Sequence, residues 1–319
     1  MSRATREAYR DTLLPLLQRR PELMCLDTDT GLFNAAYAEA AGDQYLNLGI
    51  AEHNLMGVAA GMAASGRVPF VNTMAAFATS RALEAIKIDI AYNRLPVRIM
   101  ATHGGLAAGH LGPTHQALED LAVMRVLPGM TVVVPADAAA TEAFVEQSAD
   151  VDALPGPLYV RLGRKPSPAL PATEPPVIGQ AQTLREGGDV VLVSCGPYPV
   201  LACLAAADVL AEGGIEATVL NMHTLRPFDT RTLVAAARPA PLVVTLEEHW
   251  RSGGLGGAVA EALAEAAPTR VLRLGVPDRF VDEVGDQEHL VGHYELTAER
   301  VVRTVRTGLD AMALSGTNN

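Results

Sequence analysis

A glycine-flanked segment carries the first side chain that could do chemistry. Glu52 lies within Asn47-Leu-Gly-Ile-Ala-Glu-His-Asn-Leu-Met-Gly-Val-Ala-Ala-Gly-Met-Ala. Gly57, Gly61 and Ala64 fall at i, i+4 and i+7, so three small residues share one helix face, where another backbone can approach closely. Two interpretations stay open. Glu52 is either a favourable acid in the first turn of a tightly packed helix, or a carboxylate directed into a cleft beside the helix N-terminus.

Three histidines lie in a glycine-rich stretch further along the chain. His103, His110 and His115 follow an apolar run at 97–101 and are interspersed with glycines. In open α/β sheets, ligands bind in loops at the carboxyl ends of parallel strands. Histidine titrates near neutral pH, which suits acid–base or hydrogen-bonding chemistry. The alternative, strongest for His110, is that a histidine only pins the loop. The spacings match no standard zinc site.

The composition limits the class of protein that carries these residues. The chain has 319 residues, 49% of them apolar and 19% charged, with a formal net charge of −11. Such a chain can bury a sizeable core, and its acidic balance disfavours nucleic acid or anionic membrane as partners. Cys25, Cys195 and Cys203 have no metal-ligand spacing and indicate buried thiols in a reducing compartment. With no signal-like or membrane-spanning stretch, the sequence predicts a cytoplasmic protein.

Short β-branched runs alternate with small-residue helical segments. Strands are expected at 97–101, 131–134, 158–162, 190–194, 217–220, 242–246 and 271–274, and helices at 81–92, 138–147, 200–212 and 256–266. Strands separated by helices of this length indicate βαβ units and parallel sheets. Five prolines at 163–176 cannot continue a helix or a central strand. We therefore predict a first domain at 1–165, a proline-rich linker at 166–179 and a second domain at 180–319.

The fold expected from this pattern is α/β, with two domains that each contain a mainly parallel sheet flanked by helices. One strand of the second sheet is allowed to run antiparallel. Neither a phosphate-binding loop nor a convincing Gly-x-Gly-x-x-Gly occurs. Arg251-Ser-Gly-Gly-Leu-Gly-Gly opens a helix but follows a late strand, which is weak evidence for a dinucleotide site.

Several separated motifs resemble the C-terminal half of transketolases, and together they cover nearly the whole chain. They are Gly-Ile-Ala-Glu-His at 49–53, the paired histidine motifs Thr102-His103 and Thr114-His115-Gln116, Thr224-Leu-Arg-Pro-Phe-Asp, Glu247-Glu-His and Leu274-Gly-Val-Pro-Asp-Arg-Phe. The resemblance implies a pyrimidine-binding domain of the thiamine-diphosphate-binding fold, followed by a transketolase C-terminal-like domain that is mainly structural.

A motif of full-length transketolases is missing. Their first domain binds the cofactor's diphosphate and divalent metal through Gly-Asp-Gly followed by an asparagine, and no Gly-Asp-Gly occurs in this sequence. The chain therefore resembles one subunit of a split transketolase. The resemblance implies thiamine diphosphate and Mg²⁺ as cofactors, held between this chain and an N-terminal partner subunit. It also implies a heterotetramer built around a homodimer of this chain, acting on small sugar substrates.

The resemblance assigns cofactor-binding roles to three residues. Glu52 is expected to contact the pyrimidine N1′ and favour the imino tautomer of the cofactor. Phe77 aligns with an aromatic residue that stacks on the pyrimidine, although ordinary core packing is the alternative. Met74 lies in the same segment, Thr73-Met-Ala-Ala-Phe, and is expected to line the same pocket.

Substrate contacts are expected from other residues. His103 and His115 are expected to line the substrate channel and handle protons on the sugar. Arg6 and Arg161 resemble arginines that grip a substrate phosphate, since a guanidinium fork fits phosphate bidentately. A surface salt bridge is the alternative for both arginines.

Two departures from the family pattern concern the donor sugar. An acidic pair, Glu-Asp, usually precedes Gly-Pro-Thr-His, but here the pair is His110-Leu111. The aspartate recognises a donor hydroxyl, and Leu111 cannot. Phe33 stands where a phosphate-binding serine is expected. We therefore expect the donor at this site to differ from the usual phosphorylated pentoses.

Three other functions compete with this interpretation. A deoxyxylulose-phosphate synthase normally carries the diphosphate-binding domain in the same chain. The β-subunit of a 2-oxoacid dehydrogenase usually has His-Ser-Gln where this chain has Thr114-His-Gln. A non-catalytic regulatory subunit would be expected to have lost Glu52 or the histidines first.

Overall fold

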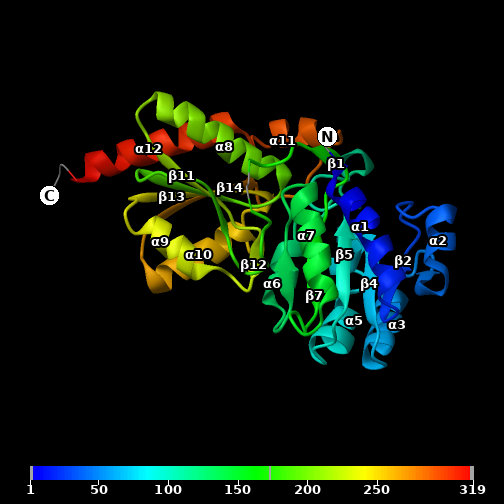
Figure 1. Cartoon of the computed structure of the whole chain (residues 1–319). Helices are drawn as coiled ribbons and strands as arrows, with labels where there is room; N and C mark the ends of the chain where they lie inside the picture. Colours follow the sequence, from blue (N-terminus) through cyan, green and yellow to red (C-terminus); the bar gives the residue numbers. More distant parts are fainter. Residues whose placement is uncertain (1–2, 172–173, 317–319) are drawn as a thin grey trace.

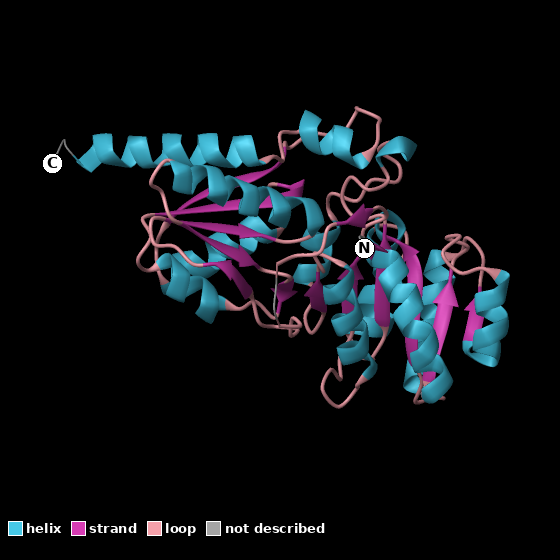
Figure 2. Ribbon diagram, turned by 45° about the horizontal axis from the view of Figure 1, so that its top comes forward, coloured by secondary structure: helices cyan, strands magenta, loops and turns pink. Residues whose placement is uncertain are grey.

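Two separate sheets organise the chain, each with helices on both faces (Figures 1 and 2). The structure is a computed structural model that describes residues 3–171 and 174–316. The predicted α/β class with two mainly parallel sheets is confirmed. The domain boundaries at 1–165 and 180–319 stay a prediction.

The first sheet has seven strands in the order β12-β6-β7-β5-β4-β2-β3. Its strands are β2 (Leu23–Asp27), β3 (Tyr45–Asn47), β4 (Val68–Met74), β5 (Arg98–Thr102), β6 (Thr131–Val133), β7 (Leu158–Arg161) and β12 (Thr224–Arg226). All neighbours are parallel except β12, which pairs antiparallel with β6. Because β12 comes from the second half of the chain, the two halves share this sheet.

Helices cover both faces of the first sheet. They are α1 (Thr5–Arg19), α2 (Ala35–Ala41), α3 (Glu52–Ala64), α4 (Ala75–Thr79), α5 (Leu83–Ala85), α6 (Asp120–Val126) and α7 (Ala138–Ala149), with short turns at η1 (Gly42–Gln44) and η3 (Gly109–Leu111). The helix expected at 81–92 is α5 followed by a π-helical segment, η2 (Ile86–Ala91). The wider π turn still buries Ile86 and Ile90 against the sheet.

The second sheet has five strands in the order β14-β13-β10-β11-β9. They are β9 (Gln182–Arg185), β10 (Val190–Ser194), β11 (Ala217–Asn221), β13 (Leu242–Trp250) and β14 (Arg270–Val276), flanked by α8 (Pro197–Glu212), α9 (Thr230–Ala237), α10 (Leu255–Ala266), α11 (Gln287–His293) and α12 (Ala298–Gly316). Only β9 runs antiparallel, so the allowance for one antiparallel strand is confirmed.

One apolar core continues from the first sheet to the second. Leu121 and Met124 of α6 belong to the same cluster as Leu225, Leu233 and Leu255. Burial of such side chains contributes roughly 1.5–3 kcal/mol each, so this continuous core holds the two halves in a fixed relation.

The segment predicted as a linker is partly ordered by pairing. β8 (Pro166–Ser167) pairs antiparallel with β1 (Arg3–Ala4) in a two-stranded ribbon, an edge position that tolerates proline. All three cysteines are buried and free, as expected. Within the described ranges, no helix combines the length and apolarity that crossing a membrane requires.

Candidate active site

The carboxyl ends of neighbouring strands bring the predicted site residues to one edge of the first sheet. β4 and β5 are parallel neighbours that end at Met74 and Thr102. Phe77 follows the first strand within α4, and His103 follows the second directly. Parallel strands deliver the residues after them to the same sheet edge, which explains how distant sequence segments meet here.

Glu52 is a buried carboxylate at the N-terminus of α3, with only 2% of its surface exposed. Its Oε2 lies 2.9 Å from Nη1 of Arg81, and the helix N-terminus also favours a negative charge. The Arg81 side chain is about half exposed (51%), and its guanidinium carbon lies 4.5 Å from the centroid of the Phe77 ring. The cation that neutralises Glu52 is therefore planar, stacked on an aromatic ring and able to leave toward solvent.

His115 joins this group through the aromatic ring. The Phe77 and His115 ring centroids are 5.2 Å apart at an interplanar angle of 73°. His115 Nδ1 lies 2.8 Å from the hydroxyl of Thr114. Met74, half-buried, precedes α4 directly. The structure thus brings Glu52, Phe77 and His115 together, with Arg81 as a contact that was not expected from the sequence.

His103 lies in a buried, electropositive part of the same edge. It is 3% exposed, its Nδ1 lies 3.0 Å from Oγ1 of Thr102, and its backbone has a left-handed φ of 60°. Burial, followed by the charges of Arg6 and Arg164, lowers the pKa of His103 to about 3. The imidazole is therefore neutral at physiological pH and acts as a hydrogen-bonding group rather than a cation.

Two arginines create that positive field. Burial and the charge of Arg164 lower the pKa of Arg6, whose buried Nε has no hydrogen-bond partner among the described residues. Nη1 of Arg164 lies 3.1 Å from both ring nitrogens of exposed His110. A buried guanidinium nitrogen without an acceptor is costly, so this position suits an anionic ligand.

Arg164 was not predicted as a site residue. The sequence pointed to Arg161 as the phosphate contact and placed Arg164 among the prolines near the expected linker. The available signal was the position of Arg164 three residues after β7 ends, at the same sheet edge as His103.

Arg161 is engaged inside the protein. It is 7% exposed, its Nε lies 3.0 Å from Oδ2 of buried Asp120, and its Nη2 donates a 2.8 Å hydrogen bond to the carbonyl of Ala117. The Tyr159 hydroxyl donates to the same Asp120 oxygen at 2.8 Å. A Cβ on Gly104 would collide with the Arg161 side chain, so this arginine packs directly against the backbone of the histidine loop.

The two residues that depart from the family pattern have different surroundings. Leu111 lies in η3 with 42% of its surface exposed, next to His110. Phe33 packs in an aromatic cluster with Tyr9, Tyr37 and Tyr45, where Phe33 and Tyr37 have ring centroids 4.6 Å apart. Leu111 is therefore available to a ligand, whereas Phe33 belongs to the core.

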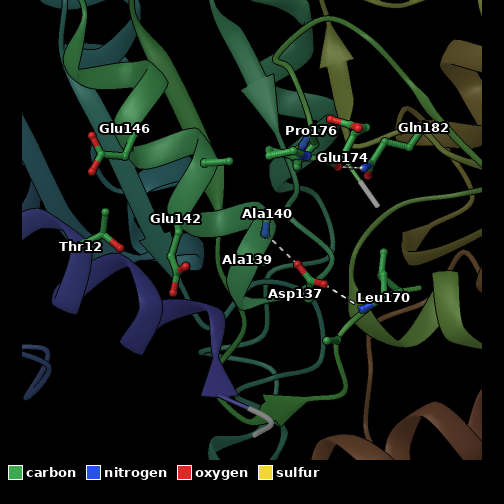
Figure 3. Close-up of a pocket in the computed structure, with 13 residues that line it drawn as sticks. Thr12, Asp137, Ala139, Ala140, Glu142, Glu146, Leu170, Glu174, Pro176 and Gln182 are labelled. Carbon is green, nitrogen blue, oxygen red and sulfur yellow. Dashed lines mark hydrogen bonds between the residues drawn. The ribbon is translucent and has the colours of Figure 1, made fainter. Parts of the chain in front are cut away.

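A cavity of about 740 Å³ lies away from Glu52 and the histidines (Figure 3). It lies between α1, α7 and residues 169–170 and 174–176, and four carboxylates line it: Asp137, Glu142, Glu146 and Glu174. Asp137 accepts the backbone N–H groups of Ala140 and Leu170 at 2.7 and 2.8 Å, which fixes its wall. Its acidic lining does not suit a phosphorylated ligand. In the described part of the chain, no group of three or more histidine, cysteine or acidic side chains could hold a metal.

Comparison with known proteins identifies two family domains in the chain. Residues 1–168 match the model described as transketolase, pyrimidine binding domain, and residues 179–301 match transketolase, C-terminal domain.

Two curated relatives match over most of their length. A 6-deoxy-6-sulfo-D-fructose transketolase subunit from Clostridium sp. (strain MSTE9) is 38% identical over 93% of this chain and 92% of its own. An apulose-4-phosphate transketolase subunit from Phocaeicola vulgatus is 37% identical over 94% and 96%. A solved structure described as a split gene transketolase, inactive β4 tetramer, is 44% identical, with a TM-score of 0.87 and coverage of 97% and 99%.

Proposed function

The chain belongs to the transketolase family, and from that premise we propose how its residues contribute to a split enzyme. The family depends on thiamine diphosphate, and the chain is a transketolase-type transferase subunit. It transfers a two-carbon ketol unit from a ketose donor to an aldehyde acceptor together with an N-terminal partner subunit. The observation that carries its own role is the buried Glu52 carboxylate beside Phe77 and His115.

The chemistry of Glu52 and its neighbours suits the pyrimidine ring of the cofactor. A planar group with N–H donors, the Arg81 guanidinium, already lies against Phe77 and bonds to Glu52. Glu52 would hold the ring through a nitrogen, while Phe77 and Met74 would hold its faces. When bound, thiamine diphosphate supplies the nucleophilic carbon that attacks the donor carbonyl. Glu52 has the chemistry to share a proton with a ring nitrogen and thereby keep the cofactor in its reactive tautomer.

The neighbouring residues would bind the sugar. Neutral His103 would hydrogen-bond to the hydroxyl and carbonyl oxygens of the sugar, and His115 would contact the same oxygens from the other arm of the loop. Arg6 and Arg164 would bind a terminal anionic group, because their charges converge on His103 and the Arg6 Nε lacks an acceptor. The predicted phosphate contact of Arg161 would require it to leave Asp120, so we assign it a supporting role instead.

The donor proposed for this site is a ketose with a terminal anion and a modified carbon opposite Leu111. The 6-deoxy-6-sulfo-D-fructose and apulose 4-phosphate that name the two relatives each carry an anionic group, which is consistent with the first feature. The partner would supply the diphosphate and Mg²⁺ ligands through Gly-Asp-Gly and asparagine. We propose a cytoplasmic heterotetramer built around two copies of this chain; the β4 assembly named for the solved relative supports self-association of such chains.

Reconstitution tests this function. The chain is co-expressed with an N-terminal transketolase subunit of the same organism, and ketol transfer is measured with thiamine diphosphate and Mg²⁺. The donors are xylulose 5-phosphate, 6-deoxy-6-sulfo-D-fructose and apulose 4-phosphate. Turnover of at least one donor, abolished by Glu52→Gln at unchanged subunit assembly, is the expected result. Decarboxylation of 2-oxoacids without ketol transfer would favour the dehydrogenase alternative. Cofactor binding without any turnover would contradict the proposal.

A further inference from the structure

A buried carboxylate from the second half of the chain holds the histidine loop of the first half. Glu248 of β13 is 6% exposed, and its Oε1 accepts the backbone N–H of Leu106 at 2.6 Å. Gln287 of α11 donates from Nε2 to both oxygens of this carboxylate, at 2.9 and 3.1 Å. The loop that starts at His103 is therefore attached to β13 of the second sheet, and α11 holds the carboxylate that makes the attachment.

Leu106, where Glu248 binds the loop, lies next to a backbone pair that joins the two segments of the loop. Gly105 and Ala117 exchange backbone hydrogen bonds of 2.9 and 3.0 Å, so the arm that leaves His103 is tied to the arm that returns from His115. Leu106 adjoins that tie directly. Displacement of Leu106 would thus move the backbone on which both proposed substrate-binding histidines depend.

The packing around Gly105 and Gly109 leaves no room for a side chain at either position. A Cβ on Gly105, whose φ is 62°, would lie 2.5 Å from Oε1 of Glu248. At the next turn, a Cβ on Gly109 would collide with Leu290 of α11 and lie 2.7 Å from the carbonyl oxygen of Gly285. The second half of the chain therefore contacts the loop at two successive positions.

The carboxylate itself is maintained at an energetic cost. Burial raises the pKa of Glu248, because a buried charge is unfavourable unless it is paired and hydrogen-bonded, and the charge of Arg161, the Leu106 amide and the Gln287 amide oppose that effect. A buried apolar residue would fill the same volume without such compensation. The backbone N–H that this carboxylate binds belongs to the histidine loop, and Gln287 fixes the orientation in which it does so.

We propose that Glu248 is a positioning residue of the transketolase site, which sets the placement of His103 and His115 through the Leu106 amide. This inference rests on the proposed function for the roles of the two histidines. It also changes the role expected for the second domain, which then takes part directly in organising the substrate site rather than being mainly structural.

Hydrogen–deuterium exchange of the chain without cofactor tests the positioning directly. Glu248→Leu removes the acceptor, and exchange in the segment 104–117 is expected to accelerate at least about tenfold, while β10 and β11 stay protected. Glu248→Gln keeps an oxygen acceptor, and the Gln287 amide can rotate to meet it, so exchange should return most of the way to wild type. Glu247→Gln is the matched control, because Glu247 binds the N–H groups of Leu255 and Gly256 instead.

Kinetics of the reconstituted pair complete the test. Glu248→Leu should lower kcat by about 10- to 100-fold at unchanged thiamine diphosphate affinity, as expected for misplaced groups. Glu248→Gln should recover most of that loss. Faster loop exchange with wild-type kcat would overturn the proposal, as would uniform acceleration throughout the chain. If Glu248→Leu does not fold, Gln287→Ala is held to the same criteria. An inactive wild-type pair would refute the proposed function, and loop exchange would then decide the positioning alone.

Discussion

Arg81 occupies the partner position that the cofactor would need at Glu52. The guanidinium bonds to the carboxylate and stacks on Phe77, yet half of its surface is in solvent. Such a partly exposed ion pair is worth up to about 1 kcal/mol. If a pyrimidine binds Glu52 as proposed, it would have to displace this arginine, so the Arg81 contact would compete with the cofactor.

Arg81→Met should therefore tighten thiamine diphosphate binding by the reconstituted pair up to about fivefold, which corresponds to about 1 kcal/mol. Methionine keeps an apolar contact with Phe77 and removes the charge. The dissociation constant is measured by titration calorimetry against wild type, with Arg94→Met, a change away from this pocket, as control. Weaker binding by Arg81→Met would show instead that Arg81 contacts the cofactor.

His103 makes the stability of the fold depend on pH. Its pKa in the folded chain is about 3, below the ordinary value of 6.5, chiefly because it is buried. The unfolded chain therefore binds a proton that the folded chain does not, and stability falls as pH drops from about 6.5 toward 3. Between pH 7.5 and 5, one such histidine costs about 2 kcal/mol.

His103→Asn should reduce this acid sensitivity, since asparagine tolerates the left-handed backbone and does not titrate. Urea unfolding at pH 7.5 and pH 5.0 gives the free energy of unfolding for both proteins. The wild type should lose about 2 kcal/mol more than the variant. Equal losses would mean that His103 is already protonated in the folded chain at pH 5.

Leu111 is expected to select the donor through an apolar contact. Leu111→Asp should shift preference toward ordinary hydroxylated ketose phosphates, because an unpaired polar group facing leucine costs roughly 1–3 kcal/mol, or about 5- to 150-fold in kcat/KM. The ratio of kcat/KM for xylulose 5-phosphate and a deoxygenated analogue is compared in wild type and variant. An unchanged ratio would show that His110 or another group, and not Leu111, contacts the donor carbon that distinguishes the two substrates.

Helix α3 has exposed glycines that no contact within the described part of the chain requires. Gly57 and Gly61 are exposed, and a Cβ on either would meet nothing within 4 Å. Glycine in a helix interior costs about 1 kcal/mol relative to alanine. The small-residue spacing predicts that this face lets another backbone approach, and among the described residues of this chain no backbone does so.

We therefore expect Gly61→Ala to raise the free energy of unfolding of the isolated chain by about 0.5–1 kcal/mol while weakening assembly with the partner or a second copy. Unfolding by urea and sedimentation of the subunit mixture measure the two effects. Arg19→Ala on α1 is the surface control. Stabilisation without any change in assembly would mean that the α3 face stays in solvent.

The elements differ in how far the sequence could predict them. Buried β-branched runs such as β10 match expectation residue for residue, because continuous apolar character is what a central parallel strand requires. The crossing of β12 into the first sheet was not predicted, since its three residues carry no signal for the strand that they pair with. The sequence motifs could assign Glu52, Phe77, His103 and His115 to one site. They could not show that Arg164, and not Arg161, is the arginine that faces this site. Which arginine faces the edge depends on Asp120, which is distant in sequence and buries Arg161.

At the scale of the whole molecule, the proposed function makes the site in this chain one half of a cofactor site. Its described residues provide a carboxylate, an aromatic ring, histidines and arginines, but no cluster that could hold Mg²⁺. A cofactor whose diphosphate is bound by another chain gains most of its charge-assisted contacts there. Affinity for thiamine diphosphate should then depend on assembly.

We expect the isolated chain to show no ketol transfer with thiamine diphosphate and Mg²⁺, and cofactor affinity at least about 100-fold weaker than that of the reconstituted pair, equivalent to about 2.7 kcal/mol. Activity should titrate with added partner and saturate at one partner per chain, because each cofactor needs one contribution from each kind of subunit. Cofactor affinity is followed by calorimetry and turnover by product formation. The Glu52→Gln chain should assemble with the same stoichiometry yet stay inactive, which separates assembly from chemistry. Sustained turnover by the isolated chain would refute the divided site, because all ligands for the diphosphate and the metal would then have to lie within these 319 residues.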